Sequence, residues 1–346
     1  MRRDARLALG LLTLIAAGCQ AGTPQPPGAA YEGDAFTFTE IRDGVYHARG
    51  TGSMVVGANA AVIVNEHDVL LVDSHMTPAA AWALLRELQA ITDKPVRYVV
   101  NTHFHFDHVH GNQIFGDDVE VIGHEFTREM IAGGGSASGR AWDAFVGPLP
   151  EQVAELRARA EAAPDDQELQ HQLAIQENYL AATNSVEAVA PTTTLAQRMT
   201  LFRGGREIRL IFFGRGHTGG DVVVHLPEEG VLITGDLLTE GLPYMGDGYP
   251  REWIETLEQL KPLAFDVVLP GHGQAFTDRA KIDYLQAYLM DLWRQVVALH
   301  AQGVSAEDAA AQIDMRAHGD HFTINSVGVN PHAVMRMYGL MEGTER

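Results

Sequence analysis

Short runs of β-branched and aromatic residues, separated by turn residues, fill two stretches of the chain. The first group comprises residues 36–41, 45–49, 54–64 and 69–72, and the second comprises residues 200–203, 207–213, 222–226 and 231–234. Asp-Gly and His-Asp pairs separate runs in the first group and favour tight turns. The pattern predicts two sets of β-strands.

Helical signals lie between and after these strands. Thr77 and Pro78 supply an N-cap and a first helical position, and apolar residues follow at helical spacing up to Ile91. Residues 96–100 are an apolar run that predicts a buried strand, and residues 119–122 predict another. Strand, helix and strand in this order are typical of a layered α/β domain.

Two further helical regions lie outside this alternation. Residues 150–163 and 165–182 predict a pair of helices within an insertion at about residues 146–186. A packed insertion, a lid and a dimer contact are all open interpretations of this pair. After a last predicted strand at Val267, the expected helices are residues 278–300 and two that begin at Ser305 and Pro331.

The first nineteen residues have the pattern of an export signal. Arginines precede an apolar run, Leu7–Ala17, which is too short to span a bilayer, and small residues precede Cys19. Cys19 resembles the lipidated cysteine of bacterial lipoproteins. We therefore expect a signal peptide at 1–19, a flexible linker at 20–35, and a periplasmic protein lipid-anchored to the outer membrane; an ordinary secretory signal is the alternative.

The formal net charge of −20 narrows the range of molecules that the protein is expected to bind. Such a surface repels phosphate backbones, so nucleic acid is a poor substrate candidate. We expect a small-molecule substrate, and membrane contact only through the N-terminal lipid. The oligomeric state stays open.

A cluster of histidines and one aspartate follows the strand at 96–100. In an extended segment alternate side chains share a face, so His103 and His105 can bind one ion. Asp107 and His108 are adjacent, so the chain must turn there for both to reach a second ion. Imidazole and carboxylate groups suit a catalytic divalent metal such as zinc.

Three more candidate ligands follow three other predicted strands. His217, Asp236 and His272 each stand in a glycine-flanked loop at a strand end. Side chains in such loops can converge on one edge of the sheets. Together with the cluster they complete two metal sites.

The ordered set of motifs resembles the metallo-β-lactamase superfamily over roughly residues 36–275. The motifs are His103-x-His105-x-Asp107-His108, Gly216-His217-Thr218, Gly235-Asp236 and Gly271-His272-Gly273. The resemblance implies an α/β fold, a four-layer αββα sandwich, here with the helical insertion and a C-terminal helical extension at 276–346. It also implies that His103, His105 and His217 hold one ion, that Asp107, His108 and His272 hold another, and that Asp236 bridges them.

The chemistry expected of this set is hydrolysis. Two Zn²⁺ ions would activate a bridging hydroxide, with iron and manganese as open alternatives, and Asp107 is the candidate proton shuttle. Asp73 and Asp221 are candidates to orient ligand imidazoles, with strand-end capping as the alternative. His75 and Tyr244 are candidates to line the substrate pocket, with loop capping as the alternative for His75 and core or loop packing as the alternative for Tyr244.

A sequence difference from the family's best-known lactamases narrows the range of candidate substrates. Those enzymes have cysteine where this chain has Asp236, followed by a lysine that is missing here. The resemblance is closer to the glyoxalase II and lactonase branches. We therefore expect a hydrolase of ester, lactone, thioester or amide bonds. A β-lactamase, a mononuclear iron sulfur dioxygenase and a lipoprotein that only sequesters metal are the alternatives.

Overall fold

The computed structural model describes residues 24–345. The expected signal peptide, Cys19 and the first part of the linker lie outside the described residues. No helix within residues 24–345 is long and apolar enough to cross a membrane.

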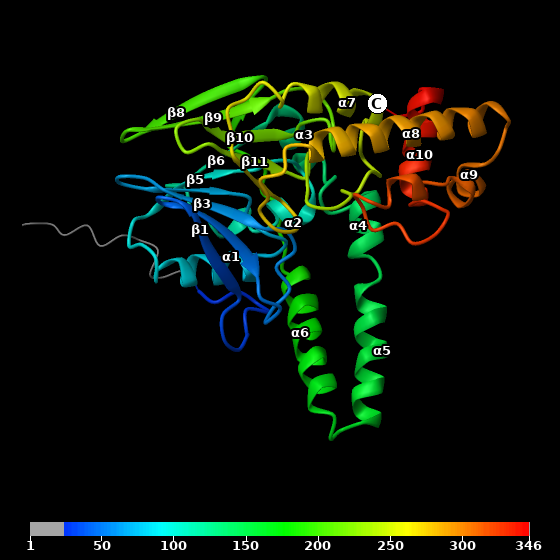
Figure 1. Ribbon diagram of the computed structural model, residues 1–346. Coiled ribbons are helices and arrows are strands. Elements are labelled where there is room, and N and C mark those ends of the chain that lie inside the picture. Colours follow the sequence, from blue (N-terminus) through cyan, green and yellow to red (C-terminus); the bar gives the residue numbers. More distant parts are fainter. Residues whose placement is uncertain (1–23, 346) are drawn as a thin grey trace, which may run out of the picture.

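The strands of the described chain form two sheets (Figure 1). The seven-stranded sheet follows chain order: β1 (Phe36–Arg42), β2 (Val45–Gly50), β3 (Ala60–Val64), β4 (Val69–Val72), β5 (Val96–Val100), β6 (Glu120–His124) and β7 (Thr193–Leu195). The five-stranded sheet has the order β12-β11-β10-β9-β8, with β8 (Arg198–Arg203), β9 (Arg206–Phe212), β10 (Val222–Leu226), β11 (Val231–Gly235) and β12 (Val267–Pro270). The pairs from β4 to β7 and the β11–β12 pair are parallel; the others are antiparallel.

The two sheets pack face to face through their apolar sides. Ile63 and Leu70 of the first sheet belong to the same buried cluster as Leu210, Val224 and Leu269 of the second. None of these side chains is accessible to solvent. Burial on both sides of a strand explains why several of these strands read as continuous apolar runs.

Helices cover the outer face of each sheet. Helix α1 (Pro78–Leu88) packs on the first sheet. The second sheet is covered by α7 (Pro250–Glu258), α8 (Lys281–Ala301) and α10 (Pro331–Glu342), with Trp253 of α7 fully buried among them. This arrangement confirms the four-layer αββα fold expected from the sequence.

The helical insertion joins β6 to β7. It consists of α3 (Glu125–Ala132), α4 (Arg140–Phe145), α5 (Leu149–Ala162) and α6 (Gln167–Thr183). The last two form a hairpin that projects away from the sandwich (Figure 1). They agree closely with the predicted helices. Helices α3 and α4 precede the range of about 146–186 predicted for the insertion.

Capping residues define the C-terminal helices as predicted. The Ser305 hydroxyl accepts a hydrogen bond from Asp308 N at the start of α9 (Ala306–Gln312), and the Asn330 side chain accepts one from His332 N at the start of α10. Short helical turns complete the described elements: α2 (Phe106–Val109), η1 (Asn112–Ile114) and η2 (Arg316–His318).

The strand predicted at 54–64 is only partly correct, because strand β3 begins at Ala60. Residues 54–59 form a loop in which Gly57 has a φ of +77°. A Cβ atom on Gly57 would lie 2.8 Å from the Cβ of Asp107, so only glycine fits this approach. Asn59 N donates a hydrogen bond to Gly271 O, which ties the loop to the opposite sheet.

The core between the sheets should be sensitive to loss of volume. Leu210→Ala removes a fully buried side chain of β9 and should lower the free energy of unfolding by about 2–5 kcal/mol. Phe202→Ala on β8, where the side chain is 66% exposed, should change it by less than about 0.5 kcal/mol. Urea unfolding in the presence of a chelator measures both; equal losses would contradict the assignment of this core.

Candidate metal centre

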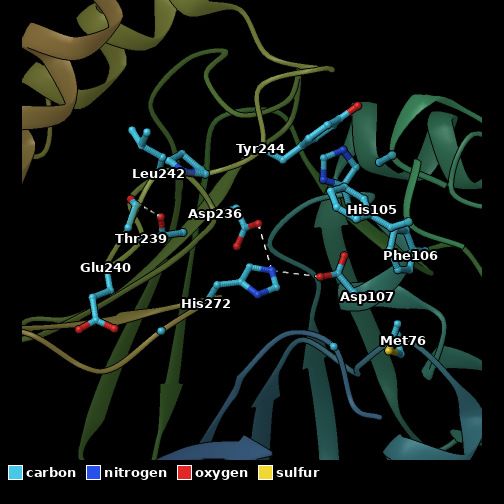
Figure 2. Close-up of a pocket in the computed structure, with 16 residues that line it drawn as sticks. Met76, His105, Phe106, Asp107, Asp236, Thr239, Glu240, Leu242, Tyr244 and His272 are labelled. Carbon is cyan, nitrogen blue, oxygen red and sulfur yellow. Dashed lines mark hydrogen bonds and ion pairs between the residues drawn. The ribbon is translucent and has the colours of Figure 1, made fainter. Parts of the chain in front are cut away.

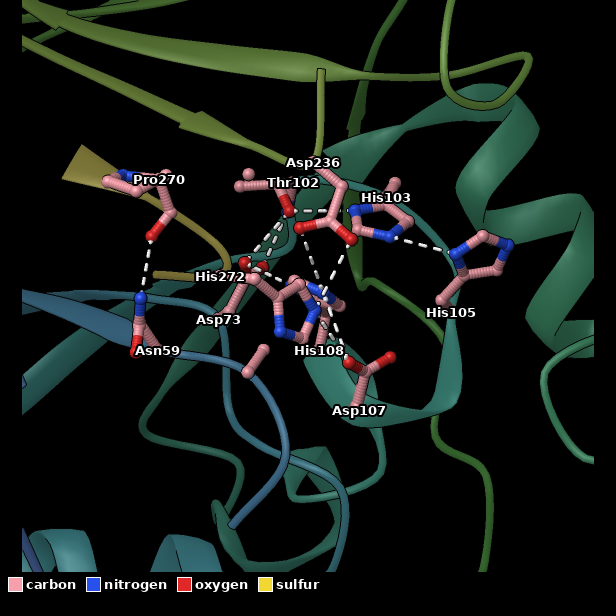
Figure 3. Close-up of polar contacts among 12 residues, drawn as sticks. Asn59, Asp73, Thr102, His103, His105, Asp107, His108, Asp236, Pro270 and His272 are labelled. Atoms are coloured by element: carbon pink, nitrogen blue, oxygen red, sulfur yellow. Dashed lines mark hydrogen bonds and ion pairs between the residues drawn. The ribbon is translucent and has the colours of Figure 1, made fainter. Parts of the chain in front are cut away.

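The seven candidate ligands meet at one edge of the sandwich, where strands of both sheets end. Figure 3 labels six of them, all but His217. His103, His105, Asp107 and His108 follow β5, with the last two on α2. His217 lies in the loop between β9 and β10, and Asp236 and His272 follow the parallel strands β11 and β12. The edge therefore collects side chains far apart in the sequence.

Three histidines form the first group, called here the histidine group: His103, His105 and His217. The Nδ1 atom of His105 lies 3.1 Å from Nε2 of His103 and 3.0 Å from Nε2 of His217. All three are buried. Donors bound to a tetrahedral zinc ion at about 2.0–2.1 Å lie about 3.3 Å from one another, close to this spacing.

Asp107, His108 and His272 form the second group, called here the mixed group. The Oδ2 atom of Asp107 lies 3.5 Å from His108 Nε2 and 3.0 Å from His272 Nε2. Asp236 lies between the two groups. Towards the mixed group, its Oδ1 is 3.6 Å from His108 Nε2 and its Oδ2 is 3.3 Å from His272 Nε2. Towards the histidine group, its Oδ2 is 3.7 Å from His217 Nε2.

Hydrogen bonds behind the ligands turn ring lone pairs towards the centre. The carboxylate of Asp73 accepts hydrogen bonds from His108 Nδ1 at 2.7 Å and from the Thr102 hydroxyl at 2.8 Å. Because that hydroxyl donates to Asp73, it accepts from His103 Nδ1, 3.0 Å away. With both Nδ1 atoms protonated, Nε2 is the ring atom by which His103 and His108 can bind a metal.

Buried polar atoms without hydrogen-bond partners also indicate that these residues can bind a metal. Among the described residues, His108 Nε2 and Asp236 Oδ1 are buried and make no hydrogen bond. Leaving such a group unsatisfied costs about 1–3 kcal/mol. A divalent cation between these atoms would satisfy both, so the donor set fits a metal.

The electrostatics of the mixed group are those of a cation site. Burial lowers the pKa of His272, but the carboxylates of Asp236 and Asp107 outweigh it and raise the pKa to about 10. The pKa of His108 lies well above its ordinary value for the same reason, with burial opposed by Asp107, Asp73 and Asp236. Burial alone would raise the pKa of Asp236, yet His272 and His108 hold it well below its ordinary value. The carboxylates thus attract positive charge into this position.

In the histidine group the pKa values of two rings shift in the opposite direction, downwards. Burial is the main cause that lowers the pKa of His217 to about 3 and the pKa of His103 well below its ordinary value. Neighbouring histidines add to the effect for both rings. These two rings are therefore neutral at pH 7, the form that binds a metal.

Asp221 does not orient an imidazole directly, contrary to one of the two sequence interpretations. Its carboxylate accepts hydrogen bonds from the backbone N and the hydroxyl of Thr218, at 2.9 and 2.6 Å. Burial raises the pKa of Asp221 to about 6, against these hydrogen bonds. Asp221 closes the turn that carries His217, which is the capping alternative.

Asp247 contacts His105, and the sequence motifs did not predict this contact. Its Oδ2 lies 3.1 Å from Nε2 of His105, so it accepts the N–H on the far side of that ring and leaves Nδ1 facing the histidine group. Asp247 stands in a Gly-Asp-Gly loop before α7, like the glycine-flanked ligands. That flanking is the only signal by which the sequence could have indicated it.

A cavity of about 450 Å³ opens on the mixed group (Figure 2). Its lining residues are Gly57, Met76, His105, Phe106, Asp107, Ala141, Phe145, Asp236, Thr239, Glu240, Gly241, Leu242, Pro243, Tyr244, His272 and Gly273. Tyr244, one of the candidates for the substrate pocket, lies in the wall of this cavity. The apolar members from the insertion, Ala141 and Phe145, were not predicted.

His75 does not line this cavity, contrary to one of its two sequence interpretations. The ring is fully buried, its Nδ1 lies 2.9 Å from Ala58 O, and its centre lies 4.8 Å from that of Phe36. Burial is the main cause that lowers its pKa to about 4, so the ring is neutral. His75 is a packed residue behind the site.

Comparisons with known proteins agree with this geometry. The family model described as the metallo-beta-lactamase superfamily matches residues 53–272. The linear primary-alkylsulfatase of a Pseudomonas species is 23% identical over 291 residues, which cover 78% of this chain and 53% of that protein. The chain therefore spans about half the length of this relative.

Solved structures show the same fold. The stereoselective inverting sec-alkylsulfatase Pisa1 of a Pseudomonas species aligns with a TM-score of 0.61 at 18% identity, over 90% of this chain and 51% of that one. A metallo-beta-lactamase from Pontibacter korlensis aligns with a TM-score of 0.53 at 20% identity, over 74% of this chain and 99% of that one. At these identities the likeness concerns the fold alone.

The role of Asp247 can be tested by one substitution. Asp247→Asn keeps the size of the side chain but removes the charge that faces His105, and should weaken metal binding about 10–100-fold. Asp117→Asn on an exposed loop is the matched control. Competition with a chromogenic chelator measures both affinities, and an unchanged affinity in Asp247→Asn would show that this contact does not support the metal.

Proposed function

Since the chain belongs to the metallo-β-lactamase superfamily, we propose that it is a hydrolase that uses two zinc ions. In this proposal the histidine group holds one ion, the mixed group holds the other, and Asp236 contacts both. The observation that carries the proposal is that this donor set opens directly onto a cavity with an apolar wall. The substrate is then a small molecule in which an apolar group adjoins an ester, lactone, thioester or amide bond.

Asp107 has the position required for proton transfer. It contacts His272 and lines the cavity, so it touches both the ligand set and the space for a substrate. When bound, two divalent cations would polarise the scissile carbonyl and lower the pKa of a coordinated water towards neutrality. Asp107 would accept the proton of the attacking water and pass it to the leaving group. The apolar wall, including Phe106 and Leu242, would exclude bulk water from this step.

The charge of the cavity favours a neutral substrate. No lysine or arginine lines it in the part of the chain that the structure describes, and Glu240 adds negative charge to the lining. A substrate that carries its own carboxylate, as β-lactam antibiotics do, would meet no side-chain cation there. This argues against the β-lactamase alternative.

The test is a substrate panel with the zinc-loaded protein. We expect chelator-sensitive hydrolysis of p-nitrophenyl esters and aliphatic lactones, and much slower turnover of a chromogenic cephalosporin. Iron loading and oxygen uptake with a persulfide substrate serve as the control for the dioxygenase alternative. Absence of hydrolysis by a fully metal-loaded protein across the whole panel would contradict the proposal.

A sulfate ester is the second candidate substrate. It is favoured by the similarity to the linear primary-alkylsulfatase, which extends over 78% of this chain. An alkyl sulfate is an anion, so the charge of the cavity lining counts against it, but it combines an apolar chain with a bond to be hydrolysed, in keeping with the apolar wall. Release of inorganic sulfate from a long-chain alkyl sulfate, at rates above those for the carboxylic esters, would favour this candidate.

The two groups should differ in how their metal binding depends on pH. An ion at the mixed group must displace protons from His108 and His272, whose pKa values are raised, whereas His103 and His217 are already neutral. Affinity at the mixed group should therefore rise with pH from 6 towards about 10, while affinity at the histidine group changes much less.

Calorimetric zinc titrations in buffers of different ionisation enthalpy measure this difference directly. We expect little proton release with the tighter ion and roughly one to two protons with the weaker one at neutral pH. Equal proton release for the two ions would contradict the assignment of charge to the two groups.

A further inference from the structure

We propose that a second cavity, next to the one at the candidate metal centre, holds the distal apolar end of the same substrate. This inference rests on the proposed hydrolase function and adds a specificity site to it. The second cavity has a volume of about 430 Å³ and lies between the loop after β11 and the C-terminal helices. It would make the enzyme selective for substrates with a long apolar chain.

The two cavities adjoin each other, which is the first reason to assign both to one substrate. Four residues line both of them: Phe145, Leu242, Pro243 and Tyr244. In this proposal a chain that starts at Asp107 and runs along the apolar wall passes these side chains on its way into the second cavity. Each cavity lies near the lower end of the usual range for small-molecule sites, about 300–1,000 Å³, so together they suit an elongated ligand.

The chemistry of the second cavity is the second argument. Its inner surface is formed by side chains that are buried in the core: Tyr288 and Leu292 from α8, Met315 from the loop after α9, and Ala333 from α10. The remaining lining residues include Thr323, Asn325, Ser326 and Asn330, which are polar but uncharged. None of the described lining residues carries a charge, so the cavity suits a neutral alkyl or acyl chain with its end near the polar rim.

The boundary between the cavities is built from two aromatic rings. The centres of the Phe145 and Tyr244 rings lie 5.4 Å apart, and Phe145 is 56% exposed. The Tyr244 hydroxyl lies 3.3 Å from Nδ1 of His332, the second residue of α10. This contact holds the Tyr244 ring at the boundary, where an apolar chain would cover the exposed face of Phe145.

The experiment narrows the second cavity without touching the first. Ser326→Trp places a large ring at an exposed position that lines only the second cavity, and Thr323→Trp does the same from another exposed position. Val327→Trp is the matched control, because Val327 is the next residue in the same loop, is 44% exposed and does not line either cavity. The zinc-loaded full chain is assayed with p-nitrophenyl butyrate and p-nitrophenyl laurate, and thermal unfolding confirms that each variant folds.

We expect the wild type to have a higher kcat/KM for laurate than for butyrate. Ser326→Trp and Thr323→Trp should lower kcat/KM for laurate about tenfold, through KM, and leave butyrate within about twofold. Tenfold corresponds to about 1.4 kcal/mol, less than the burial of two methylene groups provides. Val327→Trp should leave kcat/KM unchanged for both esters.

The outcomes separate this inference from the function on which it rests. Turnover of both esters with no preference for laurate, or equal losses on both esters in the lining variants, would overturn the second cavity as a substrate site and leave the hydrolase intact. A metal-loaded protein that hydrolyses neither ester, nor any lactone or alkyl sulfate of the panel, would overturn the hydrolase proposal and the chain-binding cavity with it.

Discussion

The structure depends on a balance of charge at one edge of the sandwich. The carboxylates of Asp107 and Asp236 are removed from most of the solvent, and such burial is stable only beside positive charge. His108 and His272 supply that charge as protonated rings, and a divalent cation can take the place of their protons. The same carboxylates therefore define where a metal binds and which histidines must release protons when it does.

The sandwich holds these charged groups in place through close backbone contacts. A Cβ atom on Gly271 would lie 2.3 Å from Asp236 Oδ1 and 2.8 Å from His108 Cε1, and one on Gly235 would lie 2.5 Å from Thr102 Oγ1. Glycine at these two strand ends is thus a condition for the ligands to converge. Asp73 adds a second constraint, because its positive φ of 66° is uncommon for a residue with a side chain and is maintained by hydrogen bonds to Thr102 and His108.

The sequence predicted what depends on local pattern. Apolar runs located most strands, capping residues located α9 and α10, and the spacing of His103, His105, Asp107 and His108 indicated a metal cluster beside a buried strand. What it could not predict depends on long-range packing. Residues 54–59 have strand-forming composition but form a loop against Asp107, and Asp247 meets His105 only because the loop before α7 folds back across the site. The second cavity likewise exists only where the C-terminal helices meet the loop after β11.

A crystal structure of the zinc-loaded protein, with anomalous data collected at the zinc edge, would show directly whether these side chains hold two ions. We expect two anomalous peaks about 3.5–4 Å apart. One should lie among His103, His105 and His217, the other among Asp107, His108 and His272, with Asp236 in contact with both. A single peak at full metal loading, or peaks outside these seven side chains, would contradict it.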